Sequence, residues 1–318
     1  MTTDYAPIVI SVYDRLEHLR ACLDSLRNSD LSRQSDLHIV SDAAHITAHE
    51  DRIAQVRNYI GQITGFRRIV PVFRDKNLGS FQSTKNAFDE ILEQYGKLIF
   101  LEDDNVVAPN FLRFLNDGLT FYQNDPRVFS ISGYNYPVNI PASYRHDVYL
   151  WQGFTAWGVG LWADRWREVT WSYAGVEQLT GRRKRELDRI SEHLYRHLAY
   201  YAAQNKLIID VIVSYHLFRH QKYSIFPVLS KVRNIGTDGT GEHSRISDRY
   251  TKQALDPGLP YQLISNLLPD EQINRILWQH FRTPPRAKAK MTLARLIPGR
   301  QKAWLKSHRH FWQGPEAH

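Results

Sequence analysis

Cysteine and long apolar runs are almost missing from this sequence. Its 318 residues contain one cysteine, which excludes an internal disulfide. Cys22 lies within a helical pattern of leucines, so we predict a small core residue and not a nucleophile. No stretch approaches the roughly 20 apolar residues that a membrane-spanning helix needs. Residues 1–7 are polar and show no secretory signal pattern, so we expect a cytoplasmic protein.

Acidic residues are missing from the stretch 282–313, which carries nine Lys or Arg. This stretch accounts for the net charge of +8, because the charges before it nearly balance. Large apolar side chains are interleaved with the basic ones, which suits a helix lying on anionic lipid and predicts a peripheral contact at the inner face of a membrane. Three prolines favour the alternative, a tail that packs on the rest of the protein. We expect no nucleic acid partner, because no binding motif accompanies the charge.

The first 135 residues alternate between the hydrophobic periods of strands and helices. Gly96 should end one of these helices, and Pro71 should place its strand at a sheet edge or a bulge. The alternation predicts an α/β fold with an open, mostly parallel sheet that is flanked by helices and binds ligands at the carboxyl ends of its strands. The expected strands are 8–12, 37–41, 69–73, 98–101 and 128–132.

The pattern changes after Asn135. Five of the eight tryptophans fall between Trp151 and Trp171, and we expect most of them in the core. Helices are predicted over 185–205 and 208–218, followed by an extended segment and a glycine-rich turn over 234–241. The segment after Pro257 is less regular.

Three adjacent acids, Glu102, Asp103 and Asp104, follow the apolar strand 98–101 directly. Three carboxylates at a strand end repel one another unless positive charge neutralises them. A divalent cation such as Mn²⁺ or Mg²⁺ prefers hard oxygen ligands and would also hold the phosphates of a nucleotide. The alternative is a solvated loop of acids at the N-terminus of the next helix.

The segment 102–111, EDDNVVAPNF, resembles the acidic metal motif and helix start of GT-A glycosyltransferases, which use nucleotide sugars. The similar families are the N-acetylglucosaminyltransferase I enzymes and bacterial family-2-like sugar transferases. Segments 9–15, 39–42 and 154–162 resemble other parts of these enzymes in the same order, so the resemblance covers roughly residues 7 to 245. It implies a Rossmann-like GT-A domain with an acceptor-side subregion and a basic C-terminal tail. Its expected parts are a nucleotide-sugar-binding half (1–135), an acceptor or catalytic half of the same domain (136–256) and a C-terminal extension (257–318).

The resemblance also implies roles for single residues. Asp104 would bind the metal, Asp103 the ribose or a metal-bound water, and Glu102 the donor sugar or its ribose. Arg15 would contact the diphosphate, although it could instead pair only with a neighbouring acid. Asp42 would accept a hydrogen bond from uracil, although it could instead only cap a turn.

Weaker signals surround these residues. Asn77, in an Asn-x-Gly turn, would line the nucleotide pocket, and Trp157 beside Gly158 would form a wall of the donor site and stack on a sugar ring. His243, after the glycine-rich turn, would reach the metal or the diphosphate through a mobile loop. The alternative for His243 is a free side chain on a surface turn.

Sugar transfer with inversion needs one carboxylate that takes the proton of the acceptor hydroxyl. Asp210, at the start of the helix 208–218, occupies the place that the resemblance implies, although it could instead only stabilise that helix N-terminus. We therefore expect a metal-dependent, inverting transferase that uses a UDP-sugar and a glycan or lipid-linked acceptor. N-Acetylglucosamine or another hexose would be transferred. An inactive binding protein and a nucleotidyltransferase are the alternatives, but residues 11–15 lack the glycine expected of the latter.

Overall fold

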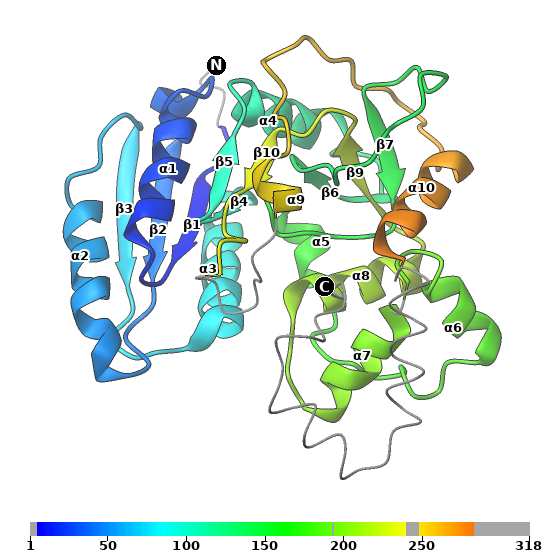
Figure 1. Ribbon diagram of the computed structural model, residues 1–318, viewed down its shortest axis with the longest axis horizontal. Helices are drawn as coiled ribbons and strands as arrows, with labels where there is room; N and C mark the ends of the chain where they lie inside the picture. The colour runs from blue at the N-terminus through cyan, green and yellow to red at the C-terminus, as the bar shows by residue number, and fades with distance from the viewer. Residues whose placement is uncertain (1–4, 193, 240–247, 283–318) are drawn as a thin grey trace.

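A computed structural model describes residues 5–192, 194–239 and 248–282. Its centre is an eight-stranded sheet with the strand order β3-β2-β1-β4-β8-β6-β9-β7 (Figure 1). All strands run in the same direction except β7 and β8, which are antiparallel to their neighbours. The predicted α/β fold with a mostly parallel sheet and flanking helices is therefore confirmed.

The strands are β1 (Ile8–Val12), β2 (Asp36–Ser41), β3 (Arg68–Phe73), β4 (Lys97–Glu102), β6 (Val128–Ser132), β7 (Val148–Trp151), β8 (Val159–Trp162) and β9 (Tyr223–Pro227). A separate two-stranded sheet pairs β5 (Asn105–Val107) with β10 (Val232–Asn234). The α-helices are α1 (Leu16–Arg27), α2 (Glu50–Ile60), α3 (Gly79–Tyr95), α4 (Phe111–Phe121), α5 (Ala163–Arg167), α6 (Gly181–Leu187), α7 (Leu194–Ala203), α8 (Ile209–His220), α9 (Asp248–Thr251) and α10 (Glu271–Phe281).

The turn and edge signals of the first half act as the sequence predicts. Pro71 lies in β3, the edge strand, where a missing ladder donor costs least. Gly96 caps α3 with a φ of 73°, a left-handed conformation that glycine adopts without strain. Cys22 is buried, and burial raises the pKa of its thiol, as expected of a core residue and not of a nucleophile.

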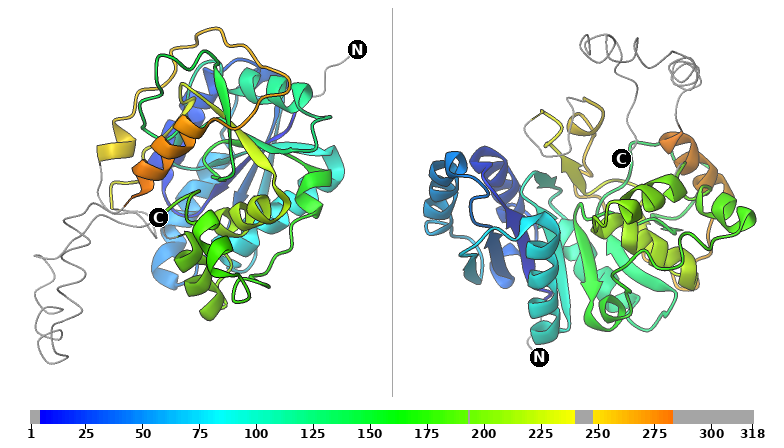
Figure 2. Two further views of the ribbon diagram at one scale, coloured as in Figure 1. Left: turned by 90° about the vertical axis from the view of Figure 1, so that its right-hand side faces the viewer. Right: turned by 90° about the horizontal axis from the view of Figure 1, so that it is seen from below.

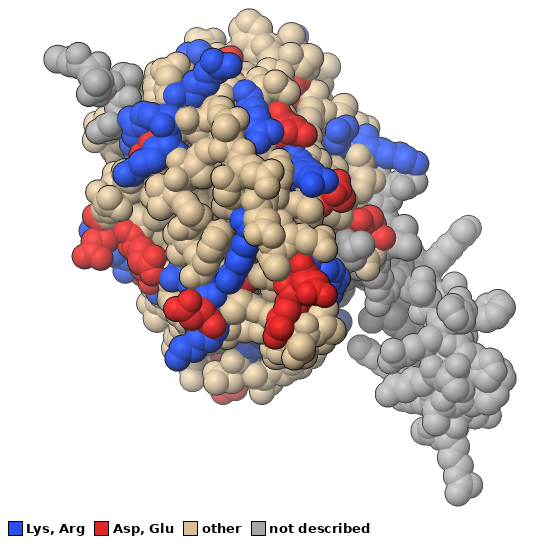
Figure 3. Space-filling view, turned by 90° about the vertical axis from the view of Figure 1, so that its left-hand side faces the viewer, with Lys and Arg blue, Asp and Glu red and all other residues tan. Residues whose placement is uncertain are grey.

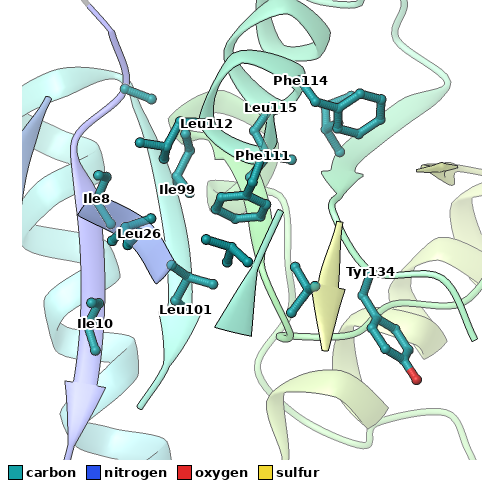
Figure 4. Close-up of a cluster of buried hydrophobic side chains, with 14 of the residues drawn as sticks. Ile8, Ile10, Leu26, Ile99, Leu101, Phe111, Leu112, Phe114, Leu115 and Tyr134 are labelled. Carbon is teal, nitrogen blue, oxygen red and sulfur yellow. The ribbon is translucent and has the colours of Figure 1, made fainter. Parts of the chain in front are cut away.

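Two helical layers cover the two faces of the sheet (Figure 2). On one face, Ile8 and Ile10 of β1 pack in a core with residues of α1, α2 and α4. Figure 4 shows Phe111 and Leu112 of α4 in this core. Val9, between the two isoleucines, packs on the other face with α3, α5 and α8. The two-residue period of the strand thus supplies both layers.

A third core cluster joins β7 and β9 to α6, α7, α8 and α10. The prediction of one helix over 185–205 is wrong, because the chain turns between α6 and α7. Asp188 stabilises this break, since its Oδ1 accepts a hydrogen bond from the backbone N–H of Tyr195 at 2.9 Å. The backbone oxygen of Asp188 accepts a second bond, from the indole of Trp278 at 3.0 Å.

The irregular segment predicted after Pro257 contains α10. Asp270 caps this helix by accepting a hydrogen bond from the backbone N–H of Ile273. Ile273 and Leu277 are buried in the third cluster. At the end of the helix, the ring of Phe281 stacks on that of Trp151, with centroids 5.6 Å apart.

Charge is mixed on one face of the described surface. Figure 3 shows Lys and Arg interspersed with Asp and Glu on the face that lies to the left in Figure 1. No helix in the described part of the chain is long and apolar enough to cross a membrane. Except for Arg282, the basic stretch 282–313 lies outside the described residues.

Candidate functional site

Several predicted site residues meet at the carboxyl edge of the parallel strands. Arg15 follows β1, Asp42 follows β2, and Glu102 is the last residue of β4. Strand β8 runs the opposite way, with Val159 paired to Phe100, so Trp157 and Gly158 reach the same edge. Ligands of open α/β sheets bind at such an edge.

The acidic triplet is tied to Arg15. The Nη2 of Arg15 donates to Asp103 and also, at 2.9 Å, to the Oδ2 of Asp104. Both aspartates are buried. Burial raises the pKa of Asp103 to about 7; the charge of Asp104 adds to this rise, and Arg15 opposes it. The single charge of Arg15 is therefore not enough to balance the carboxyl groups of the cluster.

Asp210 belongs to the same electrostatic cluster. It lies in the first turn of α8, and its Oδ2 accepts a hydrogen bond from the backbone N–H of Ala156 at 3.4 Å. Burial raises the pKa of Asp210 to about 7. Burial also raises the pKa of Glu102, and the carboxylates of Asp104, Asp210 and Asp103 raise it further. The charge of Asp210 therefore acts on Glu102 together with the charges of Asp103 and Asp104.

Asp42 and Asn77 connect β2 to the start of α3. Asp42 accepts hydrogen bonds from the backbone N–H groups of Leu78 at 3.0 Å and Gly79 at 2.9 Å, so it caps this turn. Asn77 donates to the backbone oxygen of Ala43 at 2.7 Å. The structure thus shows the capping role of Asp42, and a contact with uracil stays a prediction.

Trp157 and Gly158 pack against residues from other parts of the chain. The half-buried ring of Trp157 lies edge-on to Tyr134 and Tyr250, with centroids 5.0 and 5.5 Å away. Gly158 has a φ of +71°, and a Cβ there would lie 2.5 Å from the Cγ2 of Val232. Glycine is therefore required at position 158 for backbone conformation and for packing. Of the other tryptophans in this segment, Trp151, Trp162 and Trp166 are buried, as predicted.

Asn234 and Gly236 were not singled out from the sequence, yet both contact Asp104. The Nδ2 of Asn234 donates to the Oδ1 of Asp104 at 2.7 Å. A Cβ on Gly236 would lie 2.0 Å from the Oδ2 of Asp104. A glycine-rich turn was visible in the sequence, but nothing in its pattern indicated which carboxylate it would cover.

Asp103 and Asp104 fit a divalent cation by their chemistry. Both offer hard oxygen atoms, and the one cation that contacts them among the described residues, Arg15, is shared between the two carboxylates. Among the described residues, no group of three or more His, Cys, Asp or Glu is arranged to hold a metal ion. Mn²⁺ and Mg²⁺ need no such group, since one or two carboxylates plus substrate phosphates can hold them. His243, the other predicted metal ligand, lies outside the described residues.

Comparison with known proteins gives no family assignment. No protein-family model and no curated protein matches the chain. Among solved structures, a mannosyltransferase from Pyrobaculum calidifontis in complex with GDP-Man and Mn²⁺ matches 50% of this chain and 45% of its own, with 11% identity and a TM-score of 0.32. S. aureus TarS matches 63% of this chain and 34% of its own, with 11% identity and a TM-score of 0.33. The TarS fragment 1–349 matches 71% of this chain and 58% of its own, with 12% identity and a TM-score of 0.38.

The chain therefore spans less than two thirds of the length of each of these structures. At such TM-scores and identities, we draw no conclusion from them about donor, metal or acceptor.

Proposed function

We propose that this chain is a metal-dependent, inverting glycosyltransferase that moves a hexose from a UDP-sugar to a glycan or lipid-linked acceptor. One observation carries the proposal. Arg15, the acidic triplet and Asp210 come from three separate segments, yet they form one charged cluster at the carboxyl edge of the sheet, in which Asp103 and Asp104 are buried. The excess of buried acid suits a bound cation, and the single arginine suits a diphosphate.

The donor would be held on the Asp103 and Asp104 side. These carboxylates would hold a divalent cation, which would supply positive charge for the leaving diphosphate. Arg15, with five N–H donors and a fixed charge, would bind the phosphate oxygens beside these carboxylates. Glu102 would contact the donor sugar or its ribose. Asp42 and Asn77 would line the pocket for the uracil ring of the nucleotide. UDP and N-acetylglucosamine are the first donor components to test.

Asp210 would act as the general base. It takes the proton from an acceptor hydroxyl while that oxygen attacks the anomeric carbon of the donor. The bond from this carbon to the diphosphate breaks on the opposite face, so the configuration inverts. Because burial raises the pKa of Asp210 to about 7, its carboxylate is basic enough to accept a proton near neutral pH. Trp157 would stack on a sugar ring, and His243 would close over the diphosphate.

Nucleotide release tests the proposal. The chain is incubated with Mn²⁺, a panel of UDP-sugars and GDP-mannose, and a mixture of glycan and lipid-linked acceptors. We expect release of the nucleoside diphosphate with one donor, and its loss in Asp104→Asn and in excess EDTA. Full turnover in EDTA would contradict metal dependence. Donor binding without release would favour a binding protein, and pyrophosphate release from a nucleoside triphosphate would favour a nucleotidyltransferase.

A further inference from the structure

Asp104 has the most extensive hydrogen bonding of the three acids. Its Oδ1 accepts from the side-chain amides of Asn105 at 3.0 Å and Asn234 at 2.7 Å. Its backbone oxygen accepts from the N–H of Ile235 at 2.9 Å. Among the residues that the structure describes, its Oδ2 has one partner, of a different kind, the Nη2 of Arg15. The two carboxylate oxygens are thus held by two kinds of group, neutral amides on one side and a cation on the other.

The amide of Asn234 has a fixed orientation. Its Oδ1 accepts a hydrogen bond from the backbone N–H of Gly236 at 2.9 Å, so its Nδ2 must face Asp104. Asn234 is buried, and it pairs with Asn105 in the antiparallel ladder of β10 and β5. The ladder thereby places two amides on the same carboxylate oxygen.

Gly236 lies close to the other carboxylate oxygen of Asp104, Oδ2. A Cβ at this position would lie 2.0 Å from the Oδ2 of Asp104 and 3.0 Å from an Nη1 atom of Arg15. Only glycine allows the backbone to approach the carboxylate so closely. The turn that begins at Asn234 therefore fixes the plane of the Asp104 carboxylate from two sides.

We propose that Asn234 is a positioning residue for the metal site. By occupying Oδ1, its amide leaves Oδ2 as the single oxygen of Asp104 that is directed to a cation and to Arg15. Partners that hold a metal-binding carboxylate are typically worth roughly 10- to 100-fold in metal affinity. This role rests on the proposed function, because it requires a cation at Asp104.

Mn²⁺ affinity tests the role without any sugar transfer. The full chain is titrated with Mn²⁺ in the presence of UDP, and free Mn²⁺ is measured by electron paramagnetic resonance. We expect Asn234→Ala to raise the Mn²⁺ dissociation constant by roughly 10- to 100-fold. Asn234→Ser, whose hydroxyl can still donate, should give a smaller increase.

Asn116→Ala is the matched control. Asn116 is also a buried asparagine, but its amide bonds the backbone groups of Leu112 and Ala6 instead of a carboxylate. Its loss should leave the Mn²⁺ affinity unchanged. A thermal melt of each variant checks folding. If Asn234→Ala does not fold, the Mn²⁺ dissociation constant of Asn234→Ser tests the role instead.

The outcomes separate the two proposals. If the parent binds Mn²⁺ and both Asn234 variants bind it equally well, the positioning role is wrong while the proposed function stands. If the parent itself binds no Mn²⁺ with UDP, the metal dependence of the proposed function fails, and the role of Asn234 fails with it.

Discussion

Asp210 is the residue on which the proposed chemistry depends most. Asp210→Asn keeps the size of the side chain and removes the base, so we expect transfer to fall by roughly 10²- to 10⁴-fold. Donor affinity should stay near that of the parent, because the donor is held by other residues. Asp164→Asn is the control, since Asp164 is an exposed acid in the first turn of α5. Transfer by Asp210→Asn at the parental rate would assign the base elsewhere.

The buried acids also predict how stability depends on pH. Asp103 and Asp210 each have a folded-state pKa of about 7, above the ordinary value of 3.8. Between these values the folded chain binds more protons than the unfolded chain, so these groups stabilise the fold at low pH and lose that effect as pH rises towards 7. In EDTA, we expect this contribution to the melting temperature to fall between about pH 4 and pH 7. Asp103→Asn should flatten the fall, and an identical profile in this variant would contradict the shift.

Gly158 has a functional role predicted from the sequence and a packing role seen in the structure. The sequence predicted a donor-site wall, and the structure adds a packing constraint against Val232. Gly158→Ala should therefore destabilise the fold by about 1–3 kcal/mol, as overpacking with a strained φ does. In Gly61→Ala the new Cβ would meet its nearest atom at an ordinary 3.5 Å, so this control should change little. Urea unfolding measures both, and equal stability of the two variants would argue against the constraint.

At the scale of whole elements, α10 lies in a segment that the sequence predicted only as less regular. Leu277 of α10 is fully buried, so Leu277→Ala should lower the free energy of unfolding by about 2–5 kcal/mol. Leu268, just before the helix, is 71% exposed. Leu268→Ala should therefore change the free energy of unfolding by less than about 0.5 kcal/mol. Denaturant unfolding compares the two. Equal effects would mean that α10 does not pack on the third cluster in solution.

The sequence predicted elements well where the signal was local. The apolar run 98–101 and the acids after it were sufficient to place β4 and the candidate site at its end. The pairing of β5 with β10 was not predictable in this way, because each strand has three residues and they lie more than 120 positions apart. The contact of Asn234 with Asp104 depends on that pairing. The break at Asp188 was missed because it is fixed by contacts with Tyr195 and Trp278, while helical residues dominate the local composition.

For the molecule as a whole, the basic stretch raises the question of location. We predict that the full chain sediments with anionic vesicles at low salt, because each basic residue near such a surface contributes about 1 kcal/mol. A chain that ends at Arg282 should stay in solution. This end point keeps Phe281, whose ring packs on Trp151 and Tyr136, so α10 is left intact. If both chains stay in solution, the stretch has another role and the acceptor is reached from solution.

Strand β8 has a consequence for how substrates enter and leave. It is hydrogen-bonded to β4 on one side and to β6 on the other, so the sheet continues without interruption from β3 to β7. A hinge motion between these sides would have to break one of the two ladders. Under the proposed function, nucleotide exchange would therefore depend on movement of the segments above the sheet edge, such as the turn that begins at Asn234. Structures of the protein with and without nucleotide should superimpose over all eight strands and differ only in these segments.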